Sequence, residues 1–232
     1  MSLADDIRAE VRDIYREQWE TRDGRTVPDT EDIALGNVAV KLKGTVLYAD
    51  LADSTTMVNT KKPGFAAEVY KAYLTTACRI IRDQGGEITA FDGDRVMAVF
   101  TGDIKDTAAA KTALKINWAV ENIVNTELKN QYKESTFKVR QTVGIDTGDL
   151  WVARTGIRGA NDLVWVGRAA NYAAKLCSLG STGTPSWITE TVYNAMDRSA
   201  KYGSDGRPMW EKRTWTAYNC FVYCSNWWWP LG

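Results

Sequence analysis

The chain contains no histidine, and its four cysteines, Cys78, Cys177, Cys220 and Cys224, form no C-x-x-C pair. Without histidine there is no Ser-His-Asp or Cys-His catalytic centre, and without paired cysteines there is no zinc site of the usual spacing. Any chemistry must therefore use carboxylates, cations, hydroxyl groups and bound metal ions. Cysteines with no pairing pattern are typical of a reducing compartment, so we expect a cytoplasmic protein.

Net charge and long apolar runs are missing as well. Lys and Arg total 29, as do Asp and Glu, so no overall positive field favours nucleic acid as a partner. No apolar run is long enough to span a membrane, and the mixed charges of residues 1–20 predict no secretory signal. A hydrophobic fraction of 44% in 232 residues supports one large domain with appendages.

The spacing of apolar residues predicts the order of the secondary structure elements. Helices are expected over residues 1–20, 65–83, 107–128 and 168–178. Strands are expected over 38–50, 87–91, 95–100, 137–145, 150–154, 163–166 and 214–223, with a strand edge and short helix over 187–196. This order favours an α+β fold with helices on one face of a mainly antiparallel sheet.

The composition also suggests where the main domain begins and ends. We expect an N-terminal helix and a polar linker over residues 1–37, with the linker itself at 21–32, and a main domain over 38–225. A Trp-rich tail covers 226–232. Its three consecutive tryptophans, 227–229, are expected to pack against the domain or against a partner subunit.

Two aspartates lie at the ends of apolar, strand-like runs. Asp50 ends Val-Leu-Tyr-Ala-Asp, and Asp94 precedes Arg-Val-Met-Ala-Val-Phe. Burying a carboxylate is costly unless a positive charge faces it. Mg²⁺ and Mn²⁺ are commonly held by one or two carboxylates together with substrate phosphates. The pair therefore suggests a site for divalent cations, and phosphates become the expected neighbours.

Two further segments can bind a phosphate-bearing ligand. Leu51–Thr55 follows Asp50 and leads into a helix, whose N-terminal N–H groups can bind phosphate, although Asp53 and Ser54 can equally be helix caps alone. Arg168, Asn171 and Lys175 share one helical face. Such a basic and polar stripe is either a solvated face or a binding surface.

Four blocks resemble the class III nucleotidyl cyclases and occur in the order of that family. They are Tyr-Ala-Asp-Leu-Ala-Asp-Ser-Thr (48–55), Gly-Asp-Arg-Val-Met-Ala-Val-Phe (93–100), Gly-Ile-Asp-Thr-Gly (144–148) and Val-Gly-Arg-Ala-Ala-Asn-Tyr-Ala-Ala-Lys-Leu (166–176). The resemblance covers roughly residues 40–225. It implies a ferredoxin-like catalytic core and a head-to-tail homodimer, with active sites built across the subunit interface.

The resemblance also implies roles for individual residues. Asp50 and Asp94 would bind two Mg²⁺ or Mn²⁺ ions, with the Leu51 carbonyl as a further ligand. Asn171 matches the asparagine that orients the ribose, and Lys175 stands where the family normally has an arginine that stabilises the transition state. Lysine keeps that charge but lacks the bidentate fork. The triphosphate would be held by Leu51, Ala52, Asp53, Ser54 and Thr55.

Two positions depart from the adenylyl cyclases of this class. Those enzymes have a base-reading lysine where this chain has Ala90, and an aspartate or threonine where it has Val164. Loss of both polar side chains should abolish adenine specificity. The departures resemble those of the pyrimidine cyclases of bacterial antiphage defence (Pycsar systems). Those enzymes make cyclic UMP or cyclic CMP, which activates a separate effector.

Several residues near these positions have two readings. Tyr48 shares a strand face with Asp50, where its ring either narrows the base pocket or packs in the core. Arg95 either contacts base or phosphate or forms a surface ion pair. Arg168 is assigned to substrate binding with the rest of its helical face. Lys212 or Arg213 is a candidate contact to phosphate from the C-terminal segment.

We therefore predict a homodimeric uridylate cyclase that converts UTP to 3′,5′-cyclic UMP and pyrophosphate. The preference for UTP over CTP rests on the family alone. The alternatives are cyclisation of CTP, a purine cyclase with an unusual pocket, and a catalytically silent nucleotide-binding module. We expect no nucleic-acid partner and no membrane span, and a product that a separate effector senses.

Overall fold

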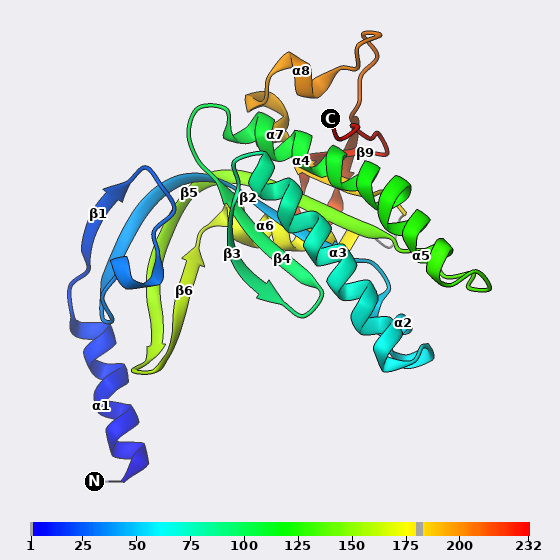
Figure 1. Cartoon of the computed structure of the whole chain (residues 1–232). Helices are drawn as coiled ribbons and strands as arrows, with labels where there is room; N and C mark the ends of the chain where they lie inside the picture. The colour runs from blue at the N-terminus through cyan, green and yellow to red at the C-terminus, as the bar shows by residue number, and fades with distance from the viewer. Residues whose placement is uncertain (1, 180–182) are drawn as a thin grey trace.

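A computed structural model describes residues 2–179 and 183–232, which form a nine-stranded sheet with helices packed on it (Figure 1). The strands are β1 (Glu20–Gly24), β2 (Val38–Leu51), β3 (Glu87–Asp92), β4 (Arg95–Phe100), β5 (Gln141–Ile157), β6 (Ala160–Val166), β7 (Ser186–Thr189), β8 (Glu211–Trp215) and β9 (Cys220–Ser225). They are ordered β3-β4-β2-β5-β7-β9-β8, with β1 paired to β2 and β6 paired to β5. Most pairs are antiparallel; β1–β2 and β5–β7 are parallel.

The helices differ in length and in where they pack. They are α1 (Leu3–Arg16), α2 (Ser54–Thr60), α3 (Pro63–Asp83), α4 (Lys105–Ala119), α5 (Asn125–Gln131), α6 (Arg168–Cys177), α7 (Glu190–Ala195) and α8 (Arg198–Lys201). A π-helical segment, Val120–Val124, joins α4 to α5, so the helix expected over 107–128 is nearly continuous. No helix in the described ranges is long and apolar enough to cross a membrane.

The α+β sheet is confirmed, but its helices are not all on one face. Leu47 and Leu51 of β2 pack with α3 and α4, whereas Val46 packs on the other side with Ala169 and Ala173 of α6. The alternation follows from strand geometry, because successive side chains point to opposite faces. Helix α6 therefore covers the face opposite α3 and α4, which corrects the one-sided prediction.

Small residues allow α6 to lie close to the sheet. A Cβ placed on Gly144 of β5 would collide with the backbone oxygen of Ala173, so only glycine fits at that point of the strand. A Cβ on Gly148 would lie 3.9 Å from the Ala169 Cβ. These contacts fix the direction of α6 along β5, and with it the positions of Asn171 and Lys175.

Three local predictions are wrong for identifiable reasons. The helix expected over 1–20 ends at Arg16, and residues 21–24 of the expected linker join Glu20 in β1, because their backbone pairs in parallel with β2. The two strands expected over 137–145 and 150–154 are one, because β5 runs without a break from Gln141 to Ile157. The strand expected over 214–223 is a hairpin of β8 and β9, interrupted where Asn219 adopts a left-handed φ of 45°.

The Trp-rich tail packs against its own domain, which confirms one of the two expected contacts. Trp227 and Trp229 pack on the α3–α4 side of the core. The Asn117 side chain of α4 donates a 2.9 Å hydrogen bond to the Trp227 carbonyl, and the Trp229 N–H donates to the Leu114 carbonyl. Trp228 remains 54% exposed.

Candidate active site

Asp50 and Asp94 lie together where β2 meets the turn between β3 and β4. The antiparallel register of β2 and β4 sets Asp50 opposite Arg95, and Asp94 is the preceding residue. Burial, and then repulsion from Asp94, raises the pKa of Asp50 to about 6. One carboxylate oxygen of Asp94 is buried and accepts no hydrogen bond from the described residues. A close carboxylate pair with an unpartnered oxygen fits a divalent cation.

The protein offers few other metal ligands at this point. No group of three or more His, Cys, Asp or Glu residues that could hold a metal occurs within residues 2–179 and 183–232. The resemblance adds the backbone carbonyl of Leu51, which is the last residue of β2 and directly follows Asp50. A site with so few protein ligands suits ions that are also coordinated by the phosphates of a substrate.

The loop after Asp50 is strained and braced by an arginine. Asp53 has a left-handed φ of 59°, which is uncommon for a residue other than glycine, and its carboxylate pairs with Arg140. The Ala52 N–H donates to the Arg140 carbonyl at 2.9 Å. Backbone strain of this kind gathers at functional sites and persists only where neighbours enforce it. Arg140 was not among the predicted site residues, and no motif marks it; only folding brings it to Asp53.

Of the two expected caps, Asp53 is the N-cap residue of α2, but no side chain caps the first turn. The N–H groups of Ser54 and Thr55 at the start of α2 are therefore not satisfied by a capping side chain. The Ala52 N–H, in contrast, is already used by Arg140. The loop thus keeps part of the phosphate-binding capacity predicted for Leu51–Thr55.

Tyr48 and Arg95 form one unit beside the aspartates. The Arg95 guanidinium lies 5.3 Å from the centre of the Tyr48 ring and pairs with Asp92 at 2.6 Å. The ion-pair reading of Arg95 is therefore confirmed. Tyr48 is half-buried and packs against the α6-side core, as does Ala90 on β3. Tyr48, Ala90 and Arg95 therefore lie on one side of the sheet beside the aspartates, and the buried Nε of Arg95 has no hydrogen-bond partner among the described residues.

Two buried groups near the aspartates have no sequence signal. Cys177, the last residue of α6, is buried, and its thiol donates to the Tyr48 carbonyl at 3.2 Å. The Tyr73 hydroxyl of α3 is buried with no hydrogen-bond partner in the described structure. Burial first, then the charges of Cys177, Asp50 and Asp94, raises the pKa of Tyr73.

The predicted polar face of α6 is divided in the structure. Arg168 pairs with the fully buried Asp146 of β5 at 3.2 Å, which gives it a structural partner. Asn171 and Lys175 are exposed, and the Lys175 ammonium lies 4.8 Å from the centre of the Tyr218 ring. The role expected for Arg168 in substrate binding therefore competes with an ion pair inside its own chain.

The residues predicted to form one site do not meet within one chain. Asn171 and Lys175 lie on α6, which packs on the same side of the sheet as Tyr48, yet no hydrogen bond or ion pair in the described structure joins them to Asp50. Val164 is exposed on β6, and three strands, β4, β2 and β5, separate β6 from the strand that carries Ala90. Lys212 and Arg213 pair with Glu190 and Glu211 instead. Within one copy the predicted site residues therefore fall into separate groups.

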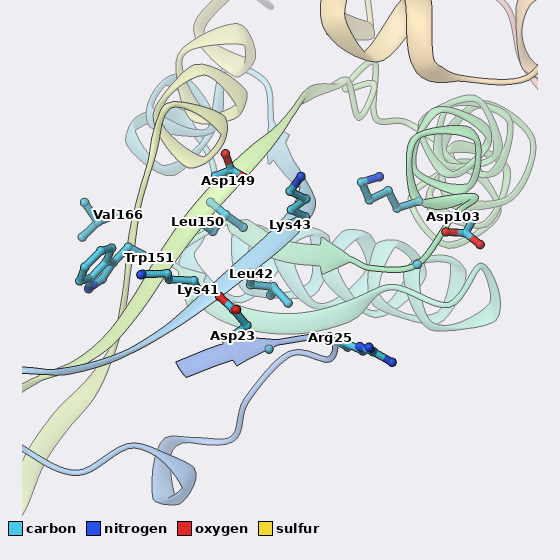
Figure 2. Close-up of a pocket in the computed structure, with 13 residues that line it drawn as sticks. Asp23, Arg25, Lys41, Leu42, Lys43, Asp103, Asp149, Leu150, Trp151 and Val166 are labelled. Carbon is cyan, nitrogen blue, oxygen red and sulfur yellow. The ribbon is translucent and has the colours of Figure 1, made fainter. Parts of the chain in front are cut away.

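A large cavity lies elsewhere, between β1, β2, β5 and the start of α4 (Figure 2). It has a volume of about 1000 Å³, and its lining includes Trp151 and the lysines Lys41 and Lys43. The lining cations are nearly balanced by Asp23, Asp103 and Asp149, so the cavity has no strong preference for an anion. None of the predicted site residues line it, and its size does not make it the active site.

Comparison with known proteins assigns the fold and the family. The model of the adenylate and guanylate cyclase catalytic domain matches residues 40–210. Relatives from Xanthomonas perforans and Burkholderia cepacia, both named uridylate cyclase, are each 51% identical over the full length of both chains. The crystal structure of the adenylyl cyclase CyaB from P. aeruginosa has a TM-score of 0.67 at 20% identity, covering 84% of this chain and 99% of that one. The chain therefore belongs to the adenylate and guanylate cyclase catalytic-domain family, the class III nucleotidyl cyclases.

Proposed function

We propose that this protein is a uridylate cyclase that converts UTP to 3′,5′-cyclic UMP and pyrophosphate. The observation that carries the proposal is an intact aspartate pair combined with an apolar residue, Ala90, where the family's adenylyl cyclases have a residue that hydrogen-bonds the nucleobase. Asp50 and Asp94 are kept together, while Ala90 beside them has no group that could hydrogen-bond a purine. The two relatives that are 51% identical over their full length, both named uridylate cyclase, support the same substrate.

Asp50, Asp94 and the Leu51 carbonyl are the residues that would hold divalent cations, Mg²⁺ or Mn²⁺. Bound there, the ions would lower the pKa of the ribose 3′-hydroxyl and offset the charge of the phosphates. The unpartnered Asp94 oxygen and the raised pKa of Asp50 support this assignment, because an ion would relieve both.

The remaining groups position the nucleotide and stabilise charge. The N–H groups at the start of α2, with Arg140 at the same loop, bind the triphosphate. The ribose 3′-oxygen forms a bond to the α-phosphorus, the bond to the bridging oxygen breaks, and pyrophosphate leaves. Asn171 orients the ribose, and Lys175 offsets the negative charge that develops on the transferred phosphoryl group. No protein base is obligatory for the proton, which Asp50 can accept.

The two halves of the site come from two chains. The aspartates and the polar face of α6 lie on one side of the sheet, are accessible, and do not touch each other. Two copies related by a two-fold axis, with these sides facing, bring the aspartates of each copy to the α6 of the other. A head-to-tail homodimer with two equivalent active sites follows from this arrangement.

The product serves as a second messenger in antiviral defence and acts on a separate effector. This part of the proposal rests on the resemblance to the pyrimidine cyclases of antiphage systems. The four cysteines are unpaired in the structure, which fits a reducing compartment such as the cytoplasm.

The substrate is tested directly by giving the purified protein each of the four ribonucleoside triphosphates with Mn²⁺. We expect cyclic UMP and pyrophosphate from UTP, identified by chromatography and mass. Cyclic CMP as the main product would show that the substrate is CTP, and cyclic AMP alone would exclude a pyrimidine pocket. No cyclic product from any triphosphate would leave a nucleotide-binding module without activity.

Activity should fall in acid because Asp50 must be ionised to bind a cation. Its pKa is about 6 in the metal-free fold, so protons compete with metal below that value. At limiting Mn²⁺, kcat/KM for UTP should fall below pH 6 by about tenfold per pH unit. Raising the Mn²⁺ concentration should shift this limb to lower pH. If the pH at which activity falls does not change with the Mn²⁺ concentration, the titrating group is not Asp50.

Replacing Tyr48 with alanine should weaken the preference for a single-ring base. The ring is half-buried beside Ala90 and stacks on Arg95, so its loss widens the space at the base. The ratio of kcat/KM for UTP to that for ATP should fall by about 10–100-fold, the range by which pocket shape alone discriminates. Tyr70→Ala, a partly buried tyrosine on α3, is the matched control and should leave the ratio unchanged. If the ratio is unchanged in Tyr48→Ala, Tyr48 only packs in the core and does not select the base.

A further inference from the structure

Lys175 contacts an aromatic ring and has no acidic partner. Its ammonium lies 4.8 Å from the centre of the Tyr218 ring. Among residues 2–179 and 183–232, no ion pair or hydrogen bond joins that ammonium to another side chain or to a carbonyl. Lys175 is otherwise exposed, so the Tyr218 ring is the described group that limits where its ammonium lies.

Arg168, on the same face of α6, shows the contrast. Its guanidinium also lies near a ring, 5.4 Å from the centre of Tyr172, but it pairs with the buried Asp146 at 3.2 Å as well. An acidic partner offsets much of a cation's charge. A ring attracts a cation through its quadrupole and carries no net charge, so the charge of Lys175 remains available to a substrate.

The Tyr218 ring is itself fixed by its neighbours. Its centre lies 4.3 Å from that of Trp215, which is buried, and 5.1 Å from that of Tyr172 on α6. The Tyr172 and Trp215 rings are 5.4 Å apart, and all three pack with Leu176 and Trp187 in one apolar cluster. Close-packed rings hold one arrangement, so the core and not Lys175 sets the position of Tyr218.

The backbone that carries Tyr218 is tied to the sheet on which α6 packs. Tyr218 ends a short 3-10 turn, Thr216–Tyr218, that joins β8 to β9. Asn219 follows in a left-handed conformation, and its N–H donates to the Thr216 carbonyl at 3.3 Å. Strand β9 pairs with β7, which pairs with β5. The ring therefore reaches Lys175 from a braced turn.

We propose that Tyr218 is the positioning residue for Lys175. A lysine carries a point charge on a flexible four-carbon stem, whereas an arginine fork is preorganised. The Tyr218 ring supplies the missing order: it holds the ammonium in one place, from which Lys175 offsets the charge that develops on the transferred phosphoryl group. This inference rests on the proposed function, in which Lys175 has that role. Tyr218 acts through Lys175 and need not touch the nucleotide.

Removing the ring tests the inference. Tyr218→Leu should lower kcat for cyclic UMP formation by about 5- to 30-fold, the range that a cation–π contact supports. KM for UTP should stay within about twofold, because the lost interaction belongs to the transition state. Tyr218→Phe should keep at least about half of the wild-type kcat, since the ring remains and the tyrosine hydroxyl forms no hydrogen bond within the described ranges.

Tyr202→Leu is the matched control. The Tyr202 ring also lies near a cation, 4.6 Å from the Arg198 guanidinium, but it follows α8, which packs on the α3–α4 side of the sheet. Its loss should leave kcat unchanged. Circular dichroism and thermal unfolding, measured on every variant, report whether the fold is retained.

A ring of the same shape but different charge distribution separates positioning from packing. A trifluorinated phenylalanine placed at position 218 keeps the ring but withdraws electron density from its face. If the ring holds the ammonium electrostatically, kcat should fall at least about threefold below that of Tyr218→Phe. Equal values in these two variants would overturn the inference, and this comparison decides the matter even if Tyr218→Leu fails to fold.

Lys175→Ala, assayed in parallel, separates this inference from the proposed function. If Lys175→Ala loses activity while Tyr218→Leu keeps kcat within about twofold, the positioning role is wrong and the proposed function stands. A raised KM with unchanged kcat in Tyr218→Leu would place the ring against the nucleotide and would also overturn the positioning role. If Lys175→Ala keeps full activity, or if the wild type cyclises no triphosphate, both proposals fail.

Discussion

Replacing Asp50 with asparagine should abolish cyclic UMP formation while making the metal-free protein more stable. Asp50 is a half-buried carboxylate beside Asp94, and this pair is the one proposed to hold the cations. Loss of a metal ligand at a phosphoryl-transfer centre should lower kcat/KM by about 1,000-fold or more. The assay is the rate of cyclic UMP formation with Mn²⁺, for which Asp94→Asn should behave alike.

The gain in stability follows from the direction of the pKa shift. The folded pKa of Asp50 is about 6, above the usual value of 3.8, so the protonated form is favoured by the fold. The stability associated with that proton is fully present below about pH 4 and is lost as the pH rises through 6. At pH 8 the ionised carboxylate therefore weakens the metal-free fold. Asparagine removes that cost, which is about 1–2 kcal/mol after allowing for screening by solvent.

Chemical denaturation at pH 8 with EDTA measures this difference. Asp50→Asn should be more stable than the wild type there, and the difference should shrink towards pH 4. Added Mn²⁺ should stabilise the wild type and leave the variant unchanged. Asp23→Asn, an exposed aspartate at the large cavity, is the control and should change neither quantity. A variant that is less stable at pH 8 would mean that Asp50 has a protein partner and no need of a cation.

Mixing two inactive variants should restore activity if each site is built from two chains. Asp50→Asn removes the metal half of the site, and Lys175→Ala removes the α6 half, so each homodimer is inactive. In a mixed dimer one of the two sites receives both intact halves. Random exchange makes half of the dimers mixed, so about a quarter of wild-type activity should return.

The control mixture is Asp50→Asn with Asp94→Asn. Both changes fall in the same half of the site, so every dimer in that mixture lacks an intact metal half and no activity should return. Cyclic UMP formation is followed after co-refolding or long incubation, which lets the subunits exchange. If the first mixture also stays inactive although the subunits have exchanged, each site is built from one chain.

Much of the fold could be predicted because its elements depend on local patterns. The apolar runs over 87–91 and 95–100 predicted β3 and β4, and the helical spacing over 65–83 predicted α3. The errors have a common cause. Residues 20–24 are polar and exposed, and they form a strand only because the backbone of β2 has a free edge beside them. Such pairing is decided by tertiary structure, and a local pattern cannot reveal it.

The candidate site shows the same division. The order of the four motifs identified the cyclase family, and the absence of histidine together with the two aspartates at strand ends indicated chemistry based on metal and phosphate. The sequence also shows Ala90 and Val164 at the two positions where adenylyl cyclases of this class have base-reading residues. These are properties of residue identity and spacing, and folding does not change them.

Only the tertiary structure decided how these groups stand to one another. It tied Arg168 to the buried Asp146, stacked Arg95 on Tyr48, and brought Arg140 to the strained loop at Asp53. It also separated the aspartates from Asn171 within one copy. The physical reason is that the chain itself fixes side-chain identity, whereas the distance between side chains far apart in sequence depends on strand register and on the face that each helix covers.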